Sequence, residues 1–162
     1  MDPYLCTGFS LPTEHEWEIA ARSGTTSEVW TGAGVYFGGM YSSNVCNNNV
    51  IIEDGVNNRL LDDYAWYFCN SNNSSQEVAT RLENGFGLYD MHGNLWEWNA
   101  DWFGCDYPNN GMWCNTVSSE RLLRGGGRGN YPESVVAAAW SSHAPAFRSK
   151  FFGFRLRKIF NP

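Results

Sequence analysis

The chain has 162 residues, a formal net charge of −6, 17% charged residues and 16% aromatic residues. This length is enough for a substantial core, so we expect a single domain over residues 1–162. The negative charge argues against a nucleic-acid partner, because a phosphate-binding surface needs a basic stripe. No apolar run approaches the roughly 18 residues of a membrane span, and the first residues lack the basic and apolar regions of a signal peptide.

The five cysteines do not predict a metal site, because their spacings fit no zinc pattern. An odd number leaves at least one thiol free or paired with another chain. We expect scattered, partly buried thiols, with a disulfide between Cys105 and Cys114 as the alternative. The cysteines are Cys6, Cys46, Cys69, Cys105 and Cys114.

Near the N-terminus the sequence predicts an edge strand over Tyr4–Phe9 and then a helix over Thr13–Arg22. Thr13 can cap this helix, and Glu16 stands three residues later, as in a capping box. Gly24 is expected to end it. One face is apolar and should pack on the core; it carries Trp17, Ala20 and Ala21.

The three histidines do not predict a metal centre. His15 lies between Glu14 and Glu16, where a solvated helix face is favoured over a metal site. His92 is interpreted as a turn or core residue. His143 is distant from both in the sequence, so no histidine cluster is indicated.

The middle of the chain is expected to contain long ordered loops. Residues 25–58 are rich in Gly, Ser and Asn but also carry aromatic residues, which favours ordered loops over disorder. Leu60–Tyr67 is expected to be a short helical turn or a strand. Residues 101–115 return to loop character.

Gly85–Phe103 is the stretch on which the rest of the chain is expected to pack. Phe86 and Leu88 alternate with other residues before a turn, and Trp96 and Trp98 alternate after it. A period of two predicts two short strands with one buried face each. The turn itself contains residues that tolerate a positive φ; it comprises Asp90, His92, Gly93 and Asn94.

Two further strands are predicted towards the C-terminus. Arg121–Arg124 enters a run of three glycines, which permits a sharp bend. Phe152–Phe160 is expected to be the final strand and to pair with an early one. We expect the rings of Phe152 and Phe154 to be buried.

Three blocks of this sequence resemble one family. Gly87–Trp98 reads Gly-Leu-Tyr-Asp-Met-His-Gly-Asn-Leu-Trp-Glu-Trp, Leu11–Arg22 begins Leu-Pro-Thr-Glu, and Leu123–Gly126 and Gly153–Leu156 form the closing blocks. In this order they are similar to the formylglycine-generating-enzyme (sulfatase-modifying factor) superfamily. The resemblance implies an α+β, C-type lectin-like fold with short antiparallel strands, one or two helices and long ordered loops. It also implies that the family's N-terminal portion is reduced or missing here.

The resemblance bears on chemistry in three ways. Members that make formylglycine use a cysteine pair between the last two blocks, and residues 127–152 contain no cysteine. Because the thiolate is both nucleophile and copper ligand there, oxidase activity is not expected. Relatives that act on thiol-histidine substrates carry an additional iron-binding domain with a histidine cluster, which this chain lacks.

Family members can also hold calcium through the Gly-Asn-x-Trp-Glu segment, here with Asn94 and Glu97 as ligands. We favour a turn Asn and a Glu satisfied by backbone amides over that calcium site. No other cofactor is expected.

Residues 124–156 resemble the variable region of phage and bacterial proteins that retroelements diversify. In those proteins the lectin-type fold is a frame, and side chains on its last strands vary to bind different targets. The resemblance implies these ligand-binding positions: Arg128, Asn130, Tyr131, Ser134, Trp140, Ser141, Ser142, His143, Phe147, Ser149, Lys150 and Phe151. Gly129 is a further candidate variable position. The implied framework positions are Arg124, Gly125, Gly126, Ala137, Ala138, Pro145, Arg148 and Gly153–Leu156. Position 128, usually Trp in the family, is Arg in this chain.

The residue types in this segment independently suit recognition, because aromatic anchors mixed with Ser and Gly are typical of binding surfaces. We expect Trp140, Phe147 and Phe151 to be exposed rather than part of the core. The functional hypothesis is a non-catalytic binding protein whose partner is a protein or glycan on a cell surface, with a virion or cell surface as its location. The alternative is an oxidase of the formylglycine-generating type.

Overall fold

The computed structural model describes residues 8–30, 35–36, 46, 51–52, 59–104 and 118–159. Part of the predicted first strand, from Tyr4 to Thr7, lies outside these residues. So do Cys105 and Cys114, the alternative disulfide pair.

The predicted N-terminal helix is confirmed as α1, Glu14–Arg22, with Thr13 as its N-cap. The Thr13 hydroxyl accepts a hydrogen bond from the Glu16 N–H at 3.2 Å, and the Glu16 carboxylate accepts one from the Thr13 N–H at 2.8 Å. This is the expected capping box. The helix ends at Arg22, and its C-cap Ser23 has the left-handed φ of 51°, one residue before the predicted stop at Gly24.

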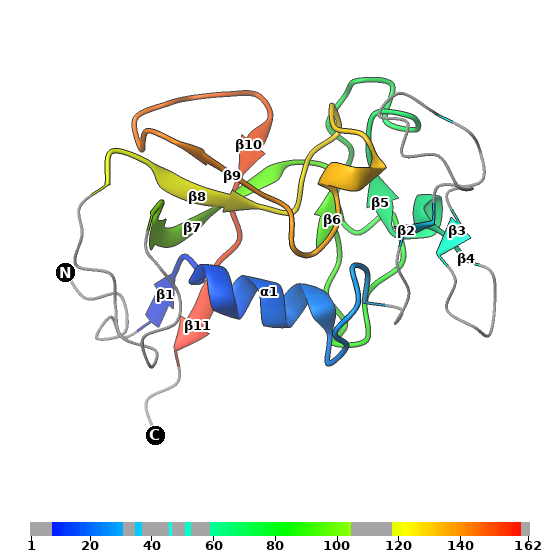
Figure 1. The fold of residues 1–162 in the computed structure, drawn as a ribbon, viewed down its shortest axis with the longest axis horizontal. Coiled ribbons are helices and arrows are strands. Elements are labelled where there is room, and N and C mark those ends of the chain that lie inside the picture. The colour runs from blue at the N-terminus through cyan, green and yellow to red at the C-terminus, as the bar shows by residue number, and fades with distance from the viewer. Residues whose placement is uncertain are drawn as a thin grey trace.

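The largest sheet has four strands in the order β10–β7–β8–β9. They are β7 (Trp96–Trp102), β8 (Arg121–Arg124), β9 (Trp140–His143) and β10 (Phe152–Gly153). β8 is antiparallel to both of its neighbours, whereas β10 runs parallel to β7. Helix α1 lies along one face of this sheet and contacts β7 and β8 (Figure 1). The opposite face, which α1 does not cover, is called the open face below.

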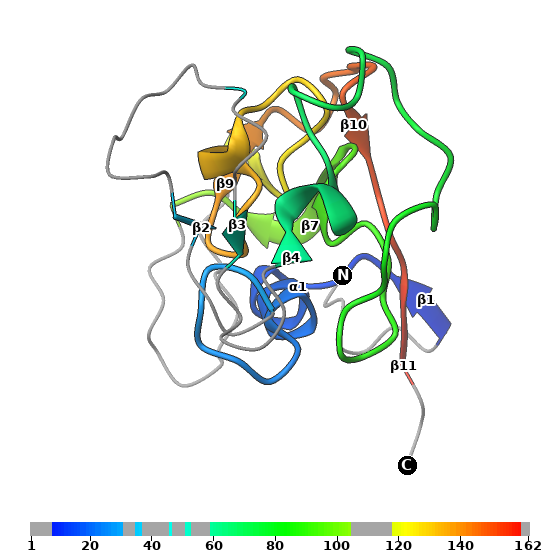
Figure 2. The ribbon, with the colours of Figure 1, turned by 90° about the vertical axis from the view of Figure 1, so that its right-hand side faces the viewer.

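The predicted pairing of the two ends of the fold is confirmed. β1 (Gly8–Ser10) pairs antiparallel with β11 (Arg157–Ile159). The expected continuous final strand is instead two strands, because the chain leaves the large sheet after Gly153 and then joins β1 (Figure 2). Phe154 lies on this crossing and is 66% exposed, so the prediction that it is buried was wrong. Phe152, inside the sheet, is half-buried.

Smaller elements complete the fold. β2 (Val35–Tyr36), β3 (Ile51–Ile52) and β4 (Arg59–Leu60) form an antiparallel sheet, and β5 (Ala65–Trp66) pairs parallel with β6 (His92–Gly93). Two short 3-10 turns cover Leu61–Asp63 and Pro132–Ser134. Residues 60–67 therefore contain both a helical turn and a strand, the two alternatives expected there.

The predicted pair of strands around the central turn was half wrong. Residues 85–91 form turns rather than a strand, and β6 pairs with β5 rather than with the segment before it. The reason is backbone geometry: Asp90, Gly93 and Asn94 all have positive φ values. A Cβ atom at Gly93 would lie 2.2 Å from the Trp66 carbonyl oxygen, so only glycine allows β5 and β6 to approach this closely.

The core consists of two clusters rather than of the β7 tryptophans. One comprises Val29, Leu61, Tyr64, Ala65, Tyr67 and Val135. The other comprises Trp17, Ala21, Met91 and Ala137. In β7, Trp96 is buried, with its indole bonded to the Asn130 side chain, whereas Trp98 and Trp102 are half-buried. The tryptophan-rich stretch thus forms an inner strand of the sheet, but its tryptophans belong to neither core cluster.

Two of the cysteines form a disulfide, Cys46–Cys69, where unpaired thiols were expected. The bridge joins residues 23 positions apart in the sequence, and spacing alone did not indicate this pair. Within the described residues, no helix is long and apolar enough to cross a membrane.

His92 is a fully buried core residue, in agreement with its interpretation from sequence. Its Nδ1 lies 2.8 Å from the Val135 carbonyl oxygen. The pKa of His92 is lowered from 6.5 to about 4: burial is the main cause, the contact with the Val135 carbonyl opposes it, and the charge of Arg22 adds a smaller lowering. The imidazole is therefore neutral in the folded protein at pH 7.

We predict that this histidine makes the fold acid-sensitive. Since its pKa is lower in the folded than in the unfolded chain, the unfolded chain binds the extra proton between pH 6.5 and 4, and stability falls as pH falls through that window. The loss due to His92 should approach about 3 kcal/mol. Urea unfolding of wild type and His92→Gln at several pH values measures it; an unchanged pH slope in the variant would contradict the assignment.

Candidate ligand-binding surface

The open face of the large sheet carries a cluster of aromatic rings. The rings of His143 and Phe147 stack with centroids 4.7 Å apart and an interplanar angle of 11°. Phe152 lies 5.0 Å from His143 and 5.5 Å from Trp98. β7, β9, β10 and the loop before β10 thus each contribute one ring to the cluster.

Two rings expected to be exposed are exposed. Trp140 is 52% and Phe147 is 49% solvent-accessible. Trp140 lies 5.2 Å from Phe103, which is itself exposed and follows β7. The Trp140–Phe103 pair lies on the α1 side of the sheet, because Trp140 stands opposite Arg124, whose side chain bonds to α1. From sequence, Phe103 belongs to a stretch of loop character, and this contact was not predicted. Phe151, also expected to be exposed, is half-buried.

A second group forms around Asn130 and Tyr131. The Asn130 side-chain oxygen accepts hydrogen bonds from the Trp96 indole at 2.8 Å and from the Gly127 N–H at 3.1 Å. The ring of Tyr131 lies 4.8 Å from Phe68, whose N–H donates to the Asn130 carbonyl at 2.8 Å. Asn130 therefore shapes its loop, and Tyr131 shares the neighbouring surface with Phe68, a residue outside the predicted region.

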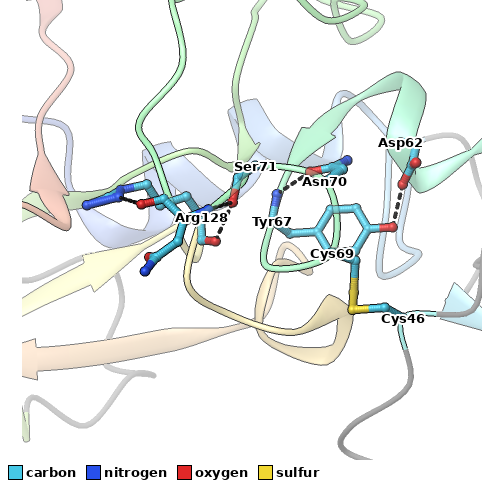
Figure 3. The surroundings of a disulfide bond; sticks show 8 residues. Cys46, Asp62, Tyr67, Cys69, Asn70, Ser71 and Arg128 are labelled. Carbon is cyan, nitrogen blue, oxygen red and sulfur yellow. Dashed lines mark hydrogen bonds between the residues drawn. A yellow bond between two sulfur atoms is a disulfide. The ribbon is translucent and has the colours of Figure 1, made fainter.

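The segment that holds the disulfide supports the chain just before this second group, at Arg128 (Figure 3). Cys69 is bonded to Cys46, and the Ser71 hydroxyl donates to the Arg128 carbonyl at 2.8 Å. On the other side of the disulfide, the Tyr67 hydroxyl donates to the Asp62 carboxylate, and burial raises the pKa of Tyr67. The loop over residues 128–131 is thus supported by a covalently fixed segment.

Arg128 was predicted to bind ligand, and the structure contradicts this. It is 4% exposed, its guanidinium donates to the Asn73 carbonyl at 2.7 Å, and it lies 4.5 Å from the Phe151 ring. These contacts join three loops, so Arg128 belongs to the frame. An arginine is rarely buried, so the residue type at position 128 gave no indication of this.

The remaining predicted positions are spread around these groups. Ser142 donates to Glu120 at 2.5 Å, and the Ser149 hydroxyl accepts from the Phe151 N–H at 3.2 Å. Lys150 is exposed and its ammonium lies 5.5 Å from the Phe151 ring, whereas Ser134 and Ser141 are half-buried. Among the framework positions, Arg124, Gly125, Gly126 and Ala137 are buried, but Ala138, Pro145 and Arg148 are exposed.

The Asn94 and Glu97 side chains do not fit a calcium site. Both Glu97 oxygens accept from Arg155, at 2.5 and 2.7 Å, and one also accepts from the Trp17 indole at 2.6 Å. The Asn94 side chain makes two hydrogen bonds to the backbone of Gln76. The Arg155 guanidinium thus occupies the Glu97 carboxylate that a calcium ion would need. The sequence-based expectation was that backbone amides would satisfy this carboxylate. The described part of the chain contains no group of three His, Cys, Asp or Glu residues that could hold a metal.

The short strands, helix α1, the pairing of β1 with β11 and the long connections in the described residues define a C-type lectin-like fold of the formylglycine-generating-enzyme type. The sequence pattern of the sulfatase-modifying factor enzyme 1-like domain matches residues 5–159, so the chain belongs to this family. Its predicted resemblance to that superfamily is confirmed.

The relatives include enzymes and a variable protein. The formylglycine-generating enzyme of Streptomyces coelicolor is 31% identical over 91% of this chain and 46% of its own. Among solved structures, Treponema denticola variable protein 1 has a TM-score of 0.66 and 31% identity, covering 93% of this chain and 47% of its own. PvdO from Pseudomonas aeruginosa has a TM-score of 0.66 and 25% identity, covering 91% and 51%. The chain thus spans about half the length of these three proteins.

The assignment of Arg128 to the frame and of Lys150 to the surface predicts unequal effects on stability. Arg128→Ala removes a buried hydrogen bond and a ring contact, so it should cost about 2 kcal/mol of unfolding free energy. Lys150→Ala should cost less than about 0.5 kcal/mol, since its side chain is exposed. Urea denaturation measures both; equal, small effects would place Arg128 back on the surface.

Proposed function

We propose that this protein is a non-catalytic ligand-binding protein that displays a diversifiable surface on its C-type lectin-like fold. A retroelement diversifies residues within 124–156, and the partner is a protein or glycan on a cell surface. The observation that carries the proposal is the exposure of Trp140 and Phe147 on a hydrogen-bonded frame. The fold shared with Treponema denticola variable protein 1 supports it.

The arrangement of the surface explains how side chains there can change without loss of the fold. Trp140 and Phe147 are about half exposed and lie outside both core clusters. By contrast, Gly126 cannot carry a side chain, because a Cβ atom would lie 2.2 Å from the Ser134 carbonyl oxygen. Within residues 124–156, positions that can change their side chain thus alternate with positions that the fold requires.

The binding surface is tested by alanine substitution at Trp140 and Phe147. The wild type is first screened on arrays of glycans and of intact bacterial cells to find what it binds. We expect the affinity of the double variant for those glycans or cells to be at least tenfold lower, because exposed aromatic rings are typical hot spots. Its urea midpoint should stay near that of the wild type. Phe86→Ala, which removes an equally exposed ring from residues 85–91, is the matched control. Retained binding would exclude this surface, and unfolding would place the rings in the core.

Diversification has its own test in the DNA. The locus should contain a reverse transcriptase gene and a near-repeat of the segment that encodes residues 127–152, with differences at adenine positions. If the locus contains neither, a retroelement does not diversify this protein, and the ligand-binding surface is then tested by the alanine substitutions alone.

A second candidate function is oxidation of a cysteine peptide, favoured by the 31% identity to the Streptomyces coelicolor enzyme. The missing cysteine pair in residues 127–152 weighs against it. Incubation with copper and a cysteine-containing peptide, read out by mass spectrometry, should give no aldehyde. Copper-dependent aldehyde formation would overturn the non-catalytic proposal.

A further inference from the structure

A groove of about 480 Å³ borders the proposed ligand surface but lies mostly outside residues 127–151. Its lining includes Leu11, Trp98, Arg121, Pro145 and Phe154. Of these, Pro145 and Phe154 lie within residues 124–156, and both are implied framework positions rather than ligand-binding positions. The groove therefore offers a concave site that does not depend on the variable side chains.

Two aromatic rings give the groove its apolar character. Trp98 is half-buried and is braced by Phe152, whose ring meets it edge-on at 5.5 Å. Phe154 is 66% exposed. A braced ring and an exposed ring can each pack against a flat apolar surface of a ligand, such as the C–H face of a pyranose.

Arg121 supplies the only charge among the described residues of the lining. Its guanidinium lies 3.8 Å from the Trp102 ring, and its Nη1 donates to the Ala100 carbonyl. Within the described part of the chain, the Asp101 carboxylate attracts this guanidinium without a hydrogen bond to Nε or Nη2. An arginine fixed by a ring and one hydrogen bond, with donors left over, is suited to binding a carboxylate.

The position of the groove argues against an added peptide strand. Trp98 and Arg121 belong to β7 and β8, which pair with each other. β10 covers the other edge of β7 only at Trp96 and Glu97, but beyond it the Ala100 N–H donates to the Pro12 carbonyl and the Ala100 carbonyl accepts from Arg121. A ligand in the groove therefore meets side chains on a sheet face rather than free backbone groups at a sheet edge. Strand addition uses the latter.

We propose that this groove binds a carboxylate-bearing sugar ring, of the uronic or sialic acid class, within a cell-surface glycan. The ring packs on Trp98 and Phe154, and the carboxylate meets Arg121. This inference rests on the proposed function for the presence of a glycan ligand, and it narrows that ligand to an acidic glycan.

The probes for the test are methyl glucuronide and methyl glucoside, which differ in the carboxylate. Tryptophan fluorescence and amide NMR shifts would give their dissociation constants with the intact chain. The glucuronide should bind at least tenfold more tightly, a difference of about 1.4 kcal/mol. Arg121→Gln should abolish this preference, whereas Lys158→Gln, which removes one positive charge elsewhere, should keep it. Phe154→Ala should weaken both sugars similarly.

Equal binding of the two sugars, or a preference that survives in Arg121→Gln, would overturn the proposal. So would tighter binding of N-acetylphenylalanine than of the glucuronide, since that would indicate a peptide carboxylate. If Arg121→Gln does not fold, two other measurements still test the groove. The indole NMR signal of Trp98 should shift when the sugar is added, and Phe154→Ala should bind the sugar more weakly than the wild type. An unchanged Trp98 signal and an unchanged affinity of Phe154→Ala would place the sugar elsewhere. The groove and the proposed ligand surface can fail separately. If the wild type binds the glucuronide but the Trp140 and Phe147 double variant still binds cells or arrays as the wild type does, the proposed surface is contradicted and the groove is not.

Discussion

The fold depends on the buried carboxylate of Glu97, which joins the helix, the large sheet and the C-terminal segment. It accepts from the Trp17 indole at 2.6 Å and from two nitrogens of Arg155 at 2.5 and 2.7 Å. Arg155 also donates to the Tyr89 carbonyl at 3.1 Å. Because breaking a buried pair leaves a charge without its partner, such a cluster resists change, with about 3–5 kcal/mol as the usual cost of losing one member.

The buried Arg124 extends this frame to the segment proposed to bind ligand. Arg124 bonds to Glu14 and Glu18 on α1 and donates to the Ala137 carbonyl at 3.0 Å. It thereby fixes the chain at two places, at the end of β8 and at Ala137 in the segment that leads to β9. The Phe151 carbonyl accepts from the Trp96 N–H at 3.0 Å and fixes the far end. With its ends held in this way, the segment can present Trp140 and Phe147 to solvent without needing them for stability.

The features that followed from the sequence are those determined by neighbouring residues or by family resemblance. The helix at Glu14–Arg22, its capping box and the pairing of β1 with β11 are of this kind. The features that did not follow depend on distant contacts. The Cys46–Cys69 disulfide and the burial of Arg128 each require the position of a loop that periodicity does not give. The groove at Trp98 and Arg121 arises only when β7, β8 and the crossing at Phe154 come together.

The tryptophans and phenylalanines divide into those of the frame and those of the ligand surface. Hydroxyl-radical footprinting with mass spectrometry tests this division most directly, because it measures the oxidation rate of each ring. We predict rapid oxidation of Trp140 and Phe147, which are about half exposed, and protection of Trp17, which is 1% exposed. Protection of Trp140 and Phe147 in the folded protein, or oxidation of Trp17 at the same rate as theirs, would contradict this division.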